Sequence, residues 1–528
     1  MRNLYVFAIG GSGERVLKSL VLTLASGVTP NVKQVIPVFV DNDEKSNALL
    51  KCLDLIRFYN SDPRTDNQMG ANTLYHELTD NVEEWPSFCK TKIAKPILLN
   101  KAGGNIGNLG KVIGKMDEKN PYLAELLEER DLLFTPDDLN MPLNVGFVGN
   151  PNIGSVVLNS LSLSDKNFTD IVGAVSSNDG VIVVGSLFGG TGAAGFPLII
   201  NTFNKIDGGN RPLLGGVAVL PYFALNGEDG TNNILDTTKY DVDSDSFDTK
   251  ARAALMYYDD YMRGMDFCYY VGDSKAKDIY PHFVGGKKQE NPTHLVELMA
   301  AMSIIEFANQ DVNNKPNSIA YKTPIWGINV GEGTVVPTNF SGIRNSELKK
   351  ALVKFKMMHE LFANDSFLKW AIKEKKDYVA NIGFTESMRM SLIDERSSQQ
   401  VSYSYGFYHI IQAWLKWIDD LGRDKAKRQF LLYDKNMSPT DDNLTKMFYS
   451  NGKAGIAKTE KVMVGIPFVN QHEVERVVPA RVAESLQKVY RALNIKDQTI
   501  EEAKRLPIML QIISKALDDV IENKCIAM

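Results

Sequence analysis

Residues 181–195 read Val-Ile-Val-Val-Gly-Ser-Leu-Phe-Gly-Gly-Thr-Gly-Ala-Ala-Gly, and they predict the fold around them. The first four are β-branched apolar residues, typical of a strand buried in a parallel sheet. Residues 195–203 are apolar and compatible with a helix, so the glycines lie where a strand turns into a helix. The first N–H groups of a helix are unpaired and lie at the positive end of its dipole. We therefore expect a phosphate-binding turn, to which Thr191 adds a hydroxyl group.

The composition is that of an ordinary soluble protein with more than one domain. A chain of 528 residues is too long for a single hydrophobic core, so two or three domains are expected. Hydrophobic residues make up 44% and charged residues 23%, both close to the averages of globular proteins. The net charge of −5 argues against a protein that binds nucleic acid generally.

The sequence predicts a cytoplasmic protein without a membrane span. The N-terminus lacks the long apolar core of a signal peptide. Residues 180–200 carry no charge and are long enough to cross a bilayer, but six glycines and Pro197 favour a strand followed by a helix. Residues 525–528 match a prenylation box, but no polybasic run precedes them, so a chance match is favoured.

Cysteine and histidine positions indicate no metal site. The six histidines are isolated and form neither a metal-binding pattern nor a catalytic triad. No two cysteines form a CxxC pair, which fits a reducing compartment and no structural zinc. The cysteines are Cys52, Cys89, Cys268 and Cys525.

The glycine turn resembles the signature loop of the tubulin/FtsZ superfamily, which reads Gly-Gly-Gly-Thr-Gly-Ser/Thr-Gly. Here the core is Gly189-Gly190-Thr191-Gly192, followed by Ala193. Phe188 replaces the first glycine of the family, and Gly195 comes one position later than its last glycine. A tight turn between a strand and a helix, without a ligand, is the alternative interpretation.

Two further glycine clusters resemble the other phosphate loops of this superfamily. Gly10-Gly11-Ser12-Gly13 follows a predicted strand over residues 4–9 and precedes a helix that begins near Glu14, and the resemblance implies that these residues, Glu14 included, contact the nucleotide. A Rossmann fingerprint, Gly-x-Gly-x-x-Gly, fails here because Val16 stands at the third glycine. Gly149-Asn150 follows a predicted strand over 143–148 and resembles the loop that contacts the terminal phosphate. A turn that caps a helix is the alternative there.

Polar residues follow two more predicted strands. Asp41-Asn42-Asp43 follows the strand 35–40, where an acid such as Asp43 is expected to bind magnesium through water or to contact the nucleotide. Ordinary turn chemistry explains the same residues equally well. After the strand 213–220, residues 221–227 resemble the ribose-binding loop, with Asn226 at the place of the family's glutamate and Glu228 nearby. The family's arginine is absent from this loop.

A long apolar helix is predicted over about 291–309 and resembles the central helix of the superfamily. Asn291 is expected either to read the nucleotide base or to cap the helix before Pro292. The helix ends in Asn309-Gln310-Asp311-Val312-Asn313-Asn314, which is similar to the catalytic loop Asn-x-Asp-x-x-Asp. The resemblance implies that Asp311 polarises the attacking water, together with Asn309, while Asn314 replaces the second aspartate. A plain turn at the end of the helix is the alternative.

These expectations define an α/β fold with a second domain. Residues 1–315 are expected to form a tubulin/FtsZ-like GTPase domain with a mostly parallel sheet, helices on both faces and an insertion at about 45–143. Residues 316–528 are expected to form a helix-rich α+β domain with a reduced sheet. Strands are predicted over 325–336, and a capping box is predicted at Thr499 and Glu502. Amphipathic helices are predicted over 346–361, 404–421, 473–493 and 499–523.

The resemblance implies a protein that binds GTP or GDP with Mg2+ and assembles head-to-tail with copies of itself. Accessory proteins are possible partners, and direct binding to nucleic acid is not expected. One rival is a nucleotide sensor or scaffold for GTP or ATP that acts with partner proteins and does not run as a filament. A second rival is a Rossmann-type oxidoreductase, against which the missing third glycine counts.

Overall fold

The computed structural model describes most of the chain. The described residues are 2–43, 45–60, 91–99, 107–117, 134–143, 146–147, 149–159, 165–206, 208–226, 246–261, 264–273, 278–281, 287–322, 345–363, 367–399, 404–421, 471–492, 500 and 502–520. They form two compact units. The first unit is Met1–Leu20, Pro30–Leu53 and Ile93–Pro324, and the second is Val21–Thr29, Asp54–Lys92 and Ile325–Met528. Unlike the two predicted domains, the units are not contiguous in sequence.

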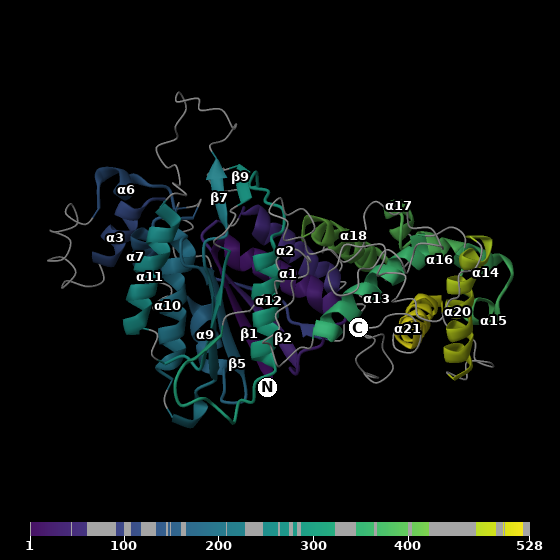
Figure 1. Cartoon of the computed structure of the whole chain (residues 1–528). Coiled ribbons are helices and arrows are strands. Elements are labelled where there is room, and N and C mark those ends of the chain that lie inside the picture. The colour runs from purple at the N-terminus through teal and green to yellow at the C-terminus, as the bar shows by residue number, and fades with distance from the viewer. Residues whose placement is uncertain are drawn as a thin grey trace. The chain divides into compact units, whose positions relative to one another are not determined.

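A central sheet organises the first unit (Figure 1). Across the sheet, the strands are β10 (Ala320–Lys322), β8 (Phe267–Val271), β6 (Leu213–Val219), β5 (Gly180–Ser186), β1 (Asn3–Ile9), β2 (Gln34–Val40) and β3 (Lys92–Ile93), and β4 (Ile97–Leu98) pairs with β2. The ladders from β10 through to β2 are all parallel. With β4 and β10 left aside, the order is 3-2-1-4-5-6, the order of a doubly wound Rossmann-like sheet. The strands predicted over 4–9, 35–40 and 213–220 are confirmed.

Helices cover both faces of this sheet. Successive residues of a strand point to opposite faces. A Cβ atom on Gly215 of β6 would lie 2.6 Å from Phe307 of α12 (Leu295–Ala308). One on the next residue, Gly216, would lie 2.6 Å from Phe196 of α10 (Gly190–Asn204). Therefore α10 and α12 pack on opposite faces, and glycine on β6 lets both approach closely.

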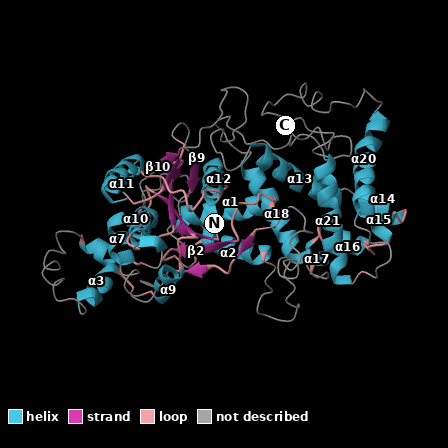
Figure 2. Ribbon diagram, turned by 90° about the horizontal axis from the view of Figure 1, so that it is seen from below, coloured by secondary structure: helices cyan, strands magenta, loops and turns pink. Residues whose placement is uncertain are grey.

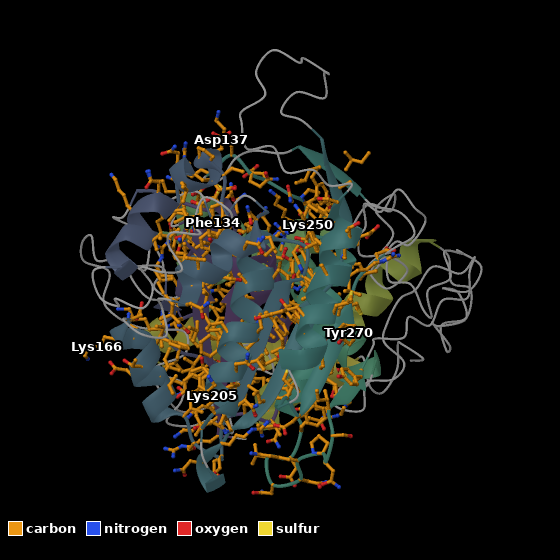
Figure 3. The ribbon with its side chains drawn as sticks, turned by 90° about the vertical axis from the view of Figure 1, so that its left-hand side faces the viewer. Phe134, Asp137, Lys166, Lys205, Lys250 and Tyr270 are labelled. Atoms are coloured by element: carbon orange, nitrogen blue, oxygen red, sulfur yellow. The ribbon has the colours of Figure 1, made fainter. Side chains whose placement is uncertain are left out.

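Helix α10 anchors the remaining helices of its face. Phe7 of β1 contacts Phe203 of α10 and Phe168 of α9 (Lys166–Ala174), with ring centroids 5.4 Å and 6.4 Å away. A Cβ atom on Gly154 of α7 (Pro151–Asn159) would lie 2.8 Å from Cβ of Ala194, so α7 packs directly on α10. Figure 3 looks onto this side and labels Lys205 at the end of α10 and Lys250 on α11 (Phe247–Tyr261).

The apolar helix α12 is fully buried, as its sequence predicts, but it begins later than expected. All 14 of its residues are buried, including Glu297 and Glu306. The expectation that Asn291 caps the helix is wrong, because His294 is the N-cap and its Nδ1 accepts a hydrogen bond of 3.1 Å from the Val296 N–H. A neutral histidine whose Nδ1 carries no proton can accept this hydrogen bond, in place of the side-chain oxygen that is usual at an N-cap.

The region between β2 and β5 contains mostly short elements. They are α2 (Asn47–Tyr59), β3, β4, α3 (Leu109–Asp117), α6 (Pro136–Asn140), α7 and α9. Of the strand predicted over 143–148, the described residues Leu143, Gly146 and Phe147 belong to no named strand, and the others lie outside the described residues. A two-stranded parallel sheet of β7 (Phe223–Asn226) and β9 (Asp278–Pro281) follows β6 in the chain.

From residue 345 onward, every described element is a helix (Figure 2). The helices are α13 (Asn345–Ala363), α14 (Phe367–Lys373), α15 (Asp377–Ala380), α16 (Glu386–Met390), α17 (Glu395–Ser398), α18 (Ser404–Leu421), α20 (Gln471–Ala492) and α21 (Glu502–Val520). The four predicted amphipathic helices are confirmed in their described parts. The strands predicted over 325–336 and the Thr499 side of the capping box lie outside the described residues.

The core of the second unit rests on large aromatic side chains and paired polar groups. Trp414 and Trp417 of α18 are fully buried, and the Trp414 Nε1–H donates a hydrogen bond of 2.7 Å to Ser26 Oγ. Lys354 of α13 pairs with Asp518 of α21 at 2.9 Å. These contacts join segments far apart in the sequence, as a helix-rich unit of this length requires.

Candidate functional site

The glycine loops of the sequence meet at one edge of the central sheet. Strands β1 and β5 are neighbours, and Ile9 at the end of β1 lies opposite Gly185. The strand order changes direction between them, so their carboxyl ends form the topological switch point at which such sheets bind ligands. The loop after β1 opens α1 (Gly10–Ala25), and the loop after β5 opens α10.

Close approach explains why these loops are rich in glycine. A Cβ atom on Gly10 would lie 3.2 Å from Thr191 Cβ, and one on Gly190 would lie 3.0 Å from the Asn150 backbone nitrogen. Gly10 and Gly149 also have φ angles of 66° and 70°, which favour glycine. The loop at residues 189–192 therefore touches both the loop at 10–13 and the loop at 149–150.

A pocket of about 200 Å³ opens between the three loops. By chemistry its lining divides into two sets: a first wall of small and polar residues, and a second wall of aromatic and apolar residues with two amides. The first wall consists of Gly10, Gly11, Ser12, Gly149, Ser186, Gly189, Gly190, Thr191 and Gly192, and the second of Phe188, Phe223, Leu225, Phe247, Gln289 and Asn291. Arg15 completes the lining and is its one charged side chain among the described residues.

The first wall has the properties of an anion site. Helix α10 begins at Gly190, and its N-cap Gly189 has no side chain to satisfy the first N–H groups. Gly192 cannot carry a Cβ atom, which would lie 2.5 Å from the Ser186 carbonyl oxygen. Gly189, Gly190, Thr191 and Gly192 line the pocket where the helix begins, and unpaired N–H groups at the start of a helix can bind an oxyanion.

Several predicted site residues lie close to the pocket without lining it. Gly13 packs α1 against the sheet, since a Cβ atom there would lie 2.8 Å from the Val184 carbonyl oxygen. Asn150 caps α7, and its Oδ1 accepts a hydrogen bond of 3.1 Å from the Asn152 N–H. The Ala193 carbonyl oxygen accepts a hydrogen bond of 2.6 Å from Tyr258. In the loop that resembles a ribose-binding loop, the backbone of Asn226 ends β7, whereas Glu228 lies outside the described residues.

Three acids form a buried group beside the first loop. Ser46 Oγ donates a hydrogen bond of 2.8 Å to Glu14 Oε2, and Glu14 Oε1 is buried without a partner among the described residues. Burial raises the pKa of Glu14, and the nearby charge of Asp41 raises it further. Burial also raises the pKa of Asp41 to about 7. Asp43 Oδ1 accepts a hydrogen bond of 3.0 Å from the Lys45 N–H, which is the contact expected if Asp43 serves only an ordinary turn.

Arg15, two positions after the first loop, was not among the predicted site residues. Its Nε donates to Glu297 Oε1 of α12 at 3.1 Å, and its Nη2 donates to the Tyr222 hydroxyl at 3.0 Å and to Ser12 Oγ at 3.3 Å. The Tyr222 hydroxyl in turn donates to Glu297 at 3.1 Å. The only signal in the sequence was a basic residue in the second turn of a helix that opens with glycines, and Glu297, its partner, lies 282 positions later.

The loop that resembles a catalytic loop lies at the other end of the sheet. Asn309 Oδ1 accepts a hydrogen bond of 2.7 Å from the Asn31 N–H, just before β2 begins. Lys315 Nζ donates to the Arg211 carbonyl oxygen at 2.6 Å, just before β6 begins. Asp311 is exposed there, and its Oδ1 accepts a hydrogen bond of 2.9 Å from the Asn313 N–H. The 14 residues of α12 separate this loop from Asn291 by about 21 Å at 1.5 Å per residue.

The fold and the pocket define the class of protein: an α/β protein with a doubly wound, mostly parallel sheet and a glycine-lined pocket at the switch point. No protein-family model matches the chain, and no curated protein matches its sequence. None of the described helices is long and apolar enough to cross a membrane. Within the described residues, no group of three or more His, Cys, Asp or Glu side chains is placed to hold a metal ion.

Proposed function

We propose that this chain is a tubulin/FtsZ-like GTP-binding protein that assembles head-to-tail into nucleotide-dependent filaments. The observation that supports it is the meeting of three glycine loops, far apart in sequence, in one pocket at the switch point. A Rossmann-type dinucleotide site relies on one glycine loop after the first strand. Here the loop after β5 contributes at least as much of the pocket lining as the loop after β1 does. This favours a nucleoside triphosphate over a dinucleotide as the ligand.

The two walls of the pocket suit the two halves of a nucleotide. The phosphates would bind the N–H groups that open α1 and α10, together with the Thr191 hydroxyl. The base would lie against the aromatic wall, where Phe188 contacts Phe247 with ring centroids 4.8 Å apart. Gln289 Nε2 donates a hydrogen bond of 2.5 Å to Asn291 Oδ1, so this pair presents amide donors and acceptors at the pocket. These groups would recognise the edge of a base.

A bound Mg2+ ion would neutralise phosphate charge, and phosphate oxygens and water usually supply most of its ligands. Ser12 and Thr191 belong to the first wall, and their hydroxyl oxygens would fit beside such an ion. They would also orient the terminal phosphate for attack.

Hydrolysis requires a second copy of the chain, because Asp311 and the pocket lie at opposite ends of one sheet. In a head-to-tail contact, Asp311 of one copy approaches the pocket of the next and polarises the attacking water. The Asn309 side chain holds the loop in place by accepting the hydrogen bond from the Asn31 N–H. Such a heterologous contact leaves open ends, so assembly continues into a filament. Asn314 carries no charge where the family has a second aspartate, so turnover would be slow.

The test is ultracentrifugal pelleting with GTP or ATP, with phosphate release measured in the same samples. We expect GTP-dependent pelleting, and Asp311→Ala should lower turnover by about 100-fold or more while GTP still binds. Asp170→Ala on α9, another exposed aspartate, is the matched control and should leave turnover unchanged.

Nucleotide binding without pelleting or turnover at high protein concentration would favour a sensor or scaffold that acts with partner proteins. Bound cofactor with nicotinamide or flavin absorbance would favour an oxidoreductase. Absence of any nucleotide binding would refute the proposal.

A further inference from the structure

We propose that Arg15 binds a phosphate group of the nucleotide through its Nη1 atom, and that Glu297 and Tyr222 hold the guanidinium in position for this contact. The inference rests on the proposed function, since it names a side chain that would act on the same ligand. It adds a charged group to a phosphate site otherwise built from backbone and hydroxyl groups.

The guanidinium is held on one side and open on the other. Nε and Nη2 are occupied by Glu297, Tyr222 and Ser12. Nη1 donates no hydrogen bond among the described residues, and a Cβ atom on Gly11 would lie 3.9 Å from it. Gly11 lines the pocket at the start of α1. Nη1 therefore lies beside the loop at which an oxyanion would bind.

The surroundings fix the plane of the guanidinium before any ligand arrives. The Arg15 Cζ atom lies 5.4 Å from the centre of the Phe223 ring, within the range of a cation–π contact. The Arg15 side chain is 14% exposed and that of Glu297 only 2%, so neither is free to swing into solvent. An arginine held by a carboxylate, a phenol and a ring loses little conformational entropy when it binds a phosphate.

The charge of Arg15 persists in this buried place. Burial opposes the charged form, but Tyr222 and Glu297 more than compensate, and the pKa of Arg15 is raised. Burial raises the pKa of Glu297, and Arg15 opposes that shift. A hydrogen bond between a guanidinium and a phosphate is stronger than one between neutral groups. Arg15 should thus contribute to binding of the phosphates and not of the nucleoside.

Simple removal of Arg15 would leave Glu297 buried and unpaired, which destabilises a protein strongly. The informative variant is the double change Arg15→Gln with Glu297→Gln, which removes both charges and keeps polar groups of similar size. Glu297→Gln alone is the matched control, because it keeps the arginine. Calorimetric titration of the full chain with GTP, GMP and guanosine compares ligands that differ only in phosphate.

The double variant should bind GTP about 10- to 100-fold more weakly, the effect of one hydrogen bond to a charged group. Its affinity for guanosine should change less than threefold, and Glu297→Gln alone should bind GTP much better than the double variant does. The affinity of the unaltered chain for GTP should also fall more steeply with salt than that of the double variant.

Equal losses for GTP and guanosine would overturn the inference, and so would an unchanged affinity for GTP in the double variant. If the unaltered chain binds no nucleotide, the proposed function fails, and the inference fails with it. Circular dichroism checks that the variants fold. If the double variant does not fold, Tyr222→Phe releases one of the groups that hold Nη2 without any change of charge. It should weaken GTP binding severalfold and leave guanosine unaffected, and the reverse pattern would overturn the inference.

Discussion

The two ends of the central sheet differ in the kind of group that they present. At the carboxyl end, glycine loops bring the backbone to a pocket whose one charged lining side chain, among the described residues, is Arg15. At the amino end, the loop from Asn309 to Lys315 presents polar side chains, and Asp311 is exposed. The first end is suited to bind an anion and the second to supply a carboxylate. In the proposed function, the two ends act together only when two copies of the chain meet.

The largest expected effect is that of adding a methyl group to a glycine at the pocket, compared with the same change at a glycine away from it. Gly192→Ala should lower the free energy of unfolding by about 3 kcal/mol and abolish nucleotide binding, because the new Cβ atom meets backbone atoms of Ser186, which cannot rotate away. Gly173 on α9 is the matched control, since a Cβ atom there meets nothing within 4 Å. Gly173→Ala should raise the stability by about 0.5–1 kcal/mol. Chemical denaturation of both variants tests the difference.

A smaller effect concerns the acids buried at the carboxyl end. The pKa of Asp41 is raised to about 7 by burial, so the folded protein binds a proton that the unfolded chain releases near pH 4. Stability should therefore be greatest at low pH and fall by about 2 kcal/mol between pH 5 and pH 7. Glu14, whose pKa is also raised, acts in the same direction.

Denaturation in urea at a series of pH values, without nucleotide, measures this slope. Asp41→Asn should flatten it, because the amide does not titrate. A stability that rises through this range would show that other groups dominate, and a slope unaffected by Asp41→Asn would exclude Asp41 as its source.

The smallest expected effect is at the amino end. Asn309→Ala removes the hydrogen bond to the Asn31 N–H and should cost about 1 kcal/mol of stability. It should leave nucleotide binding to the isolated chain unchanged, because the pocket lies at the other end of the sheet. Asn152→Ala on α7 is the control, since the exposed Asn152 side chain makes no hydrogen bond among the described residues. Weaker nucleotide binding by monomeric Asn309→Ala would contradict the separation of the two ends.

The elements of the first unit could be predicted from the sequence because their signals are local. The run 181–184 and the glycines after it predict a strand and a helix within about 20 residues, and both are present. The N-terminus of α12 was misplaced because histidine is an unusual cap, and Asn291 with Pro292 offered a stronger signal. Arg15 was overlooked because its role depends on Glu297 and Tyr222, to which no short-range pattern connects it.

The sequence by itself determined where strands turn into helices and which of those turns are rich in glycine. Both features depend only on residues that are neighbours in the chain. Only the tertiary structure decided that three such turns meet in one pocket, that Arg15 faces it, and that Asp311 lies at the opposite end of the sheet. The physical reason is that strand order and helix packing bring together residues more than a hundred positions apart. That order follows from burial of the whole core, to which each segment contributes only a part.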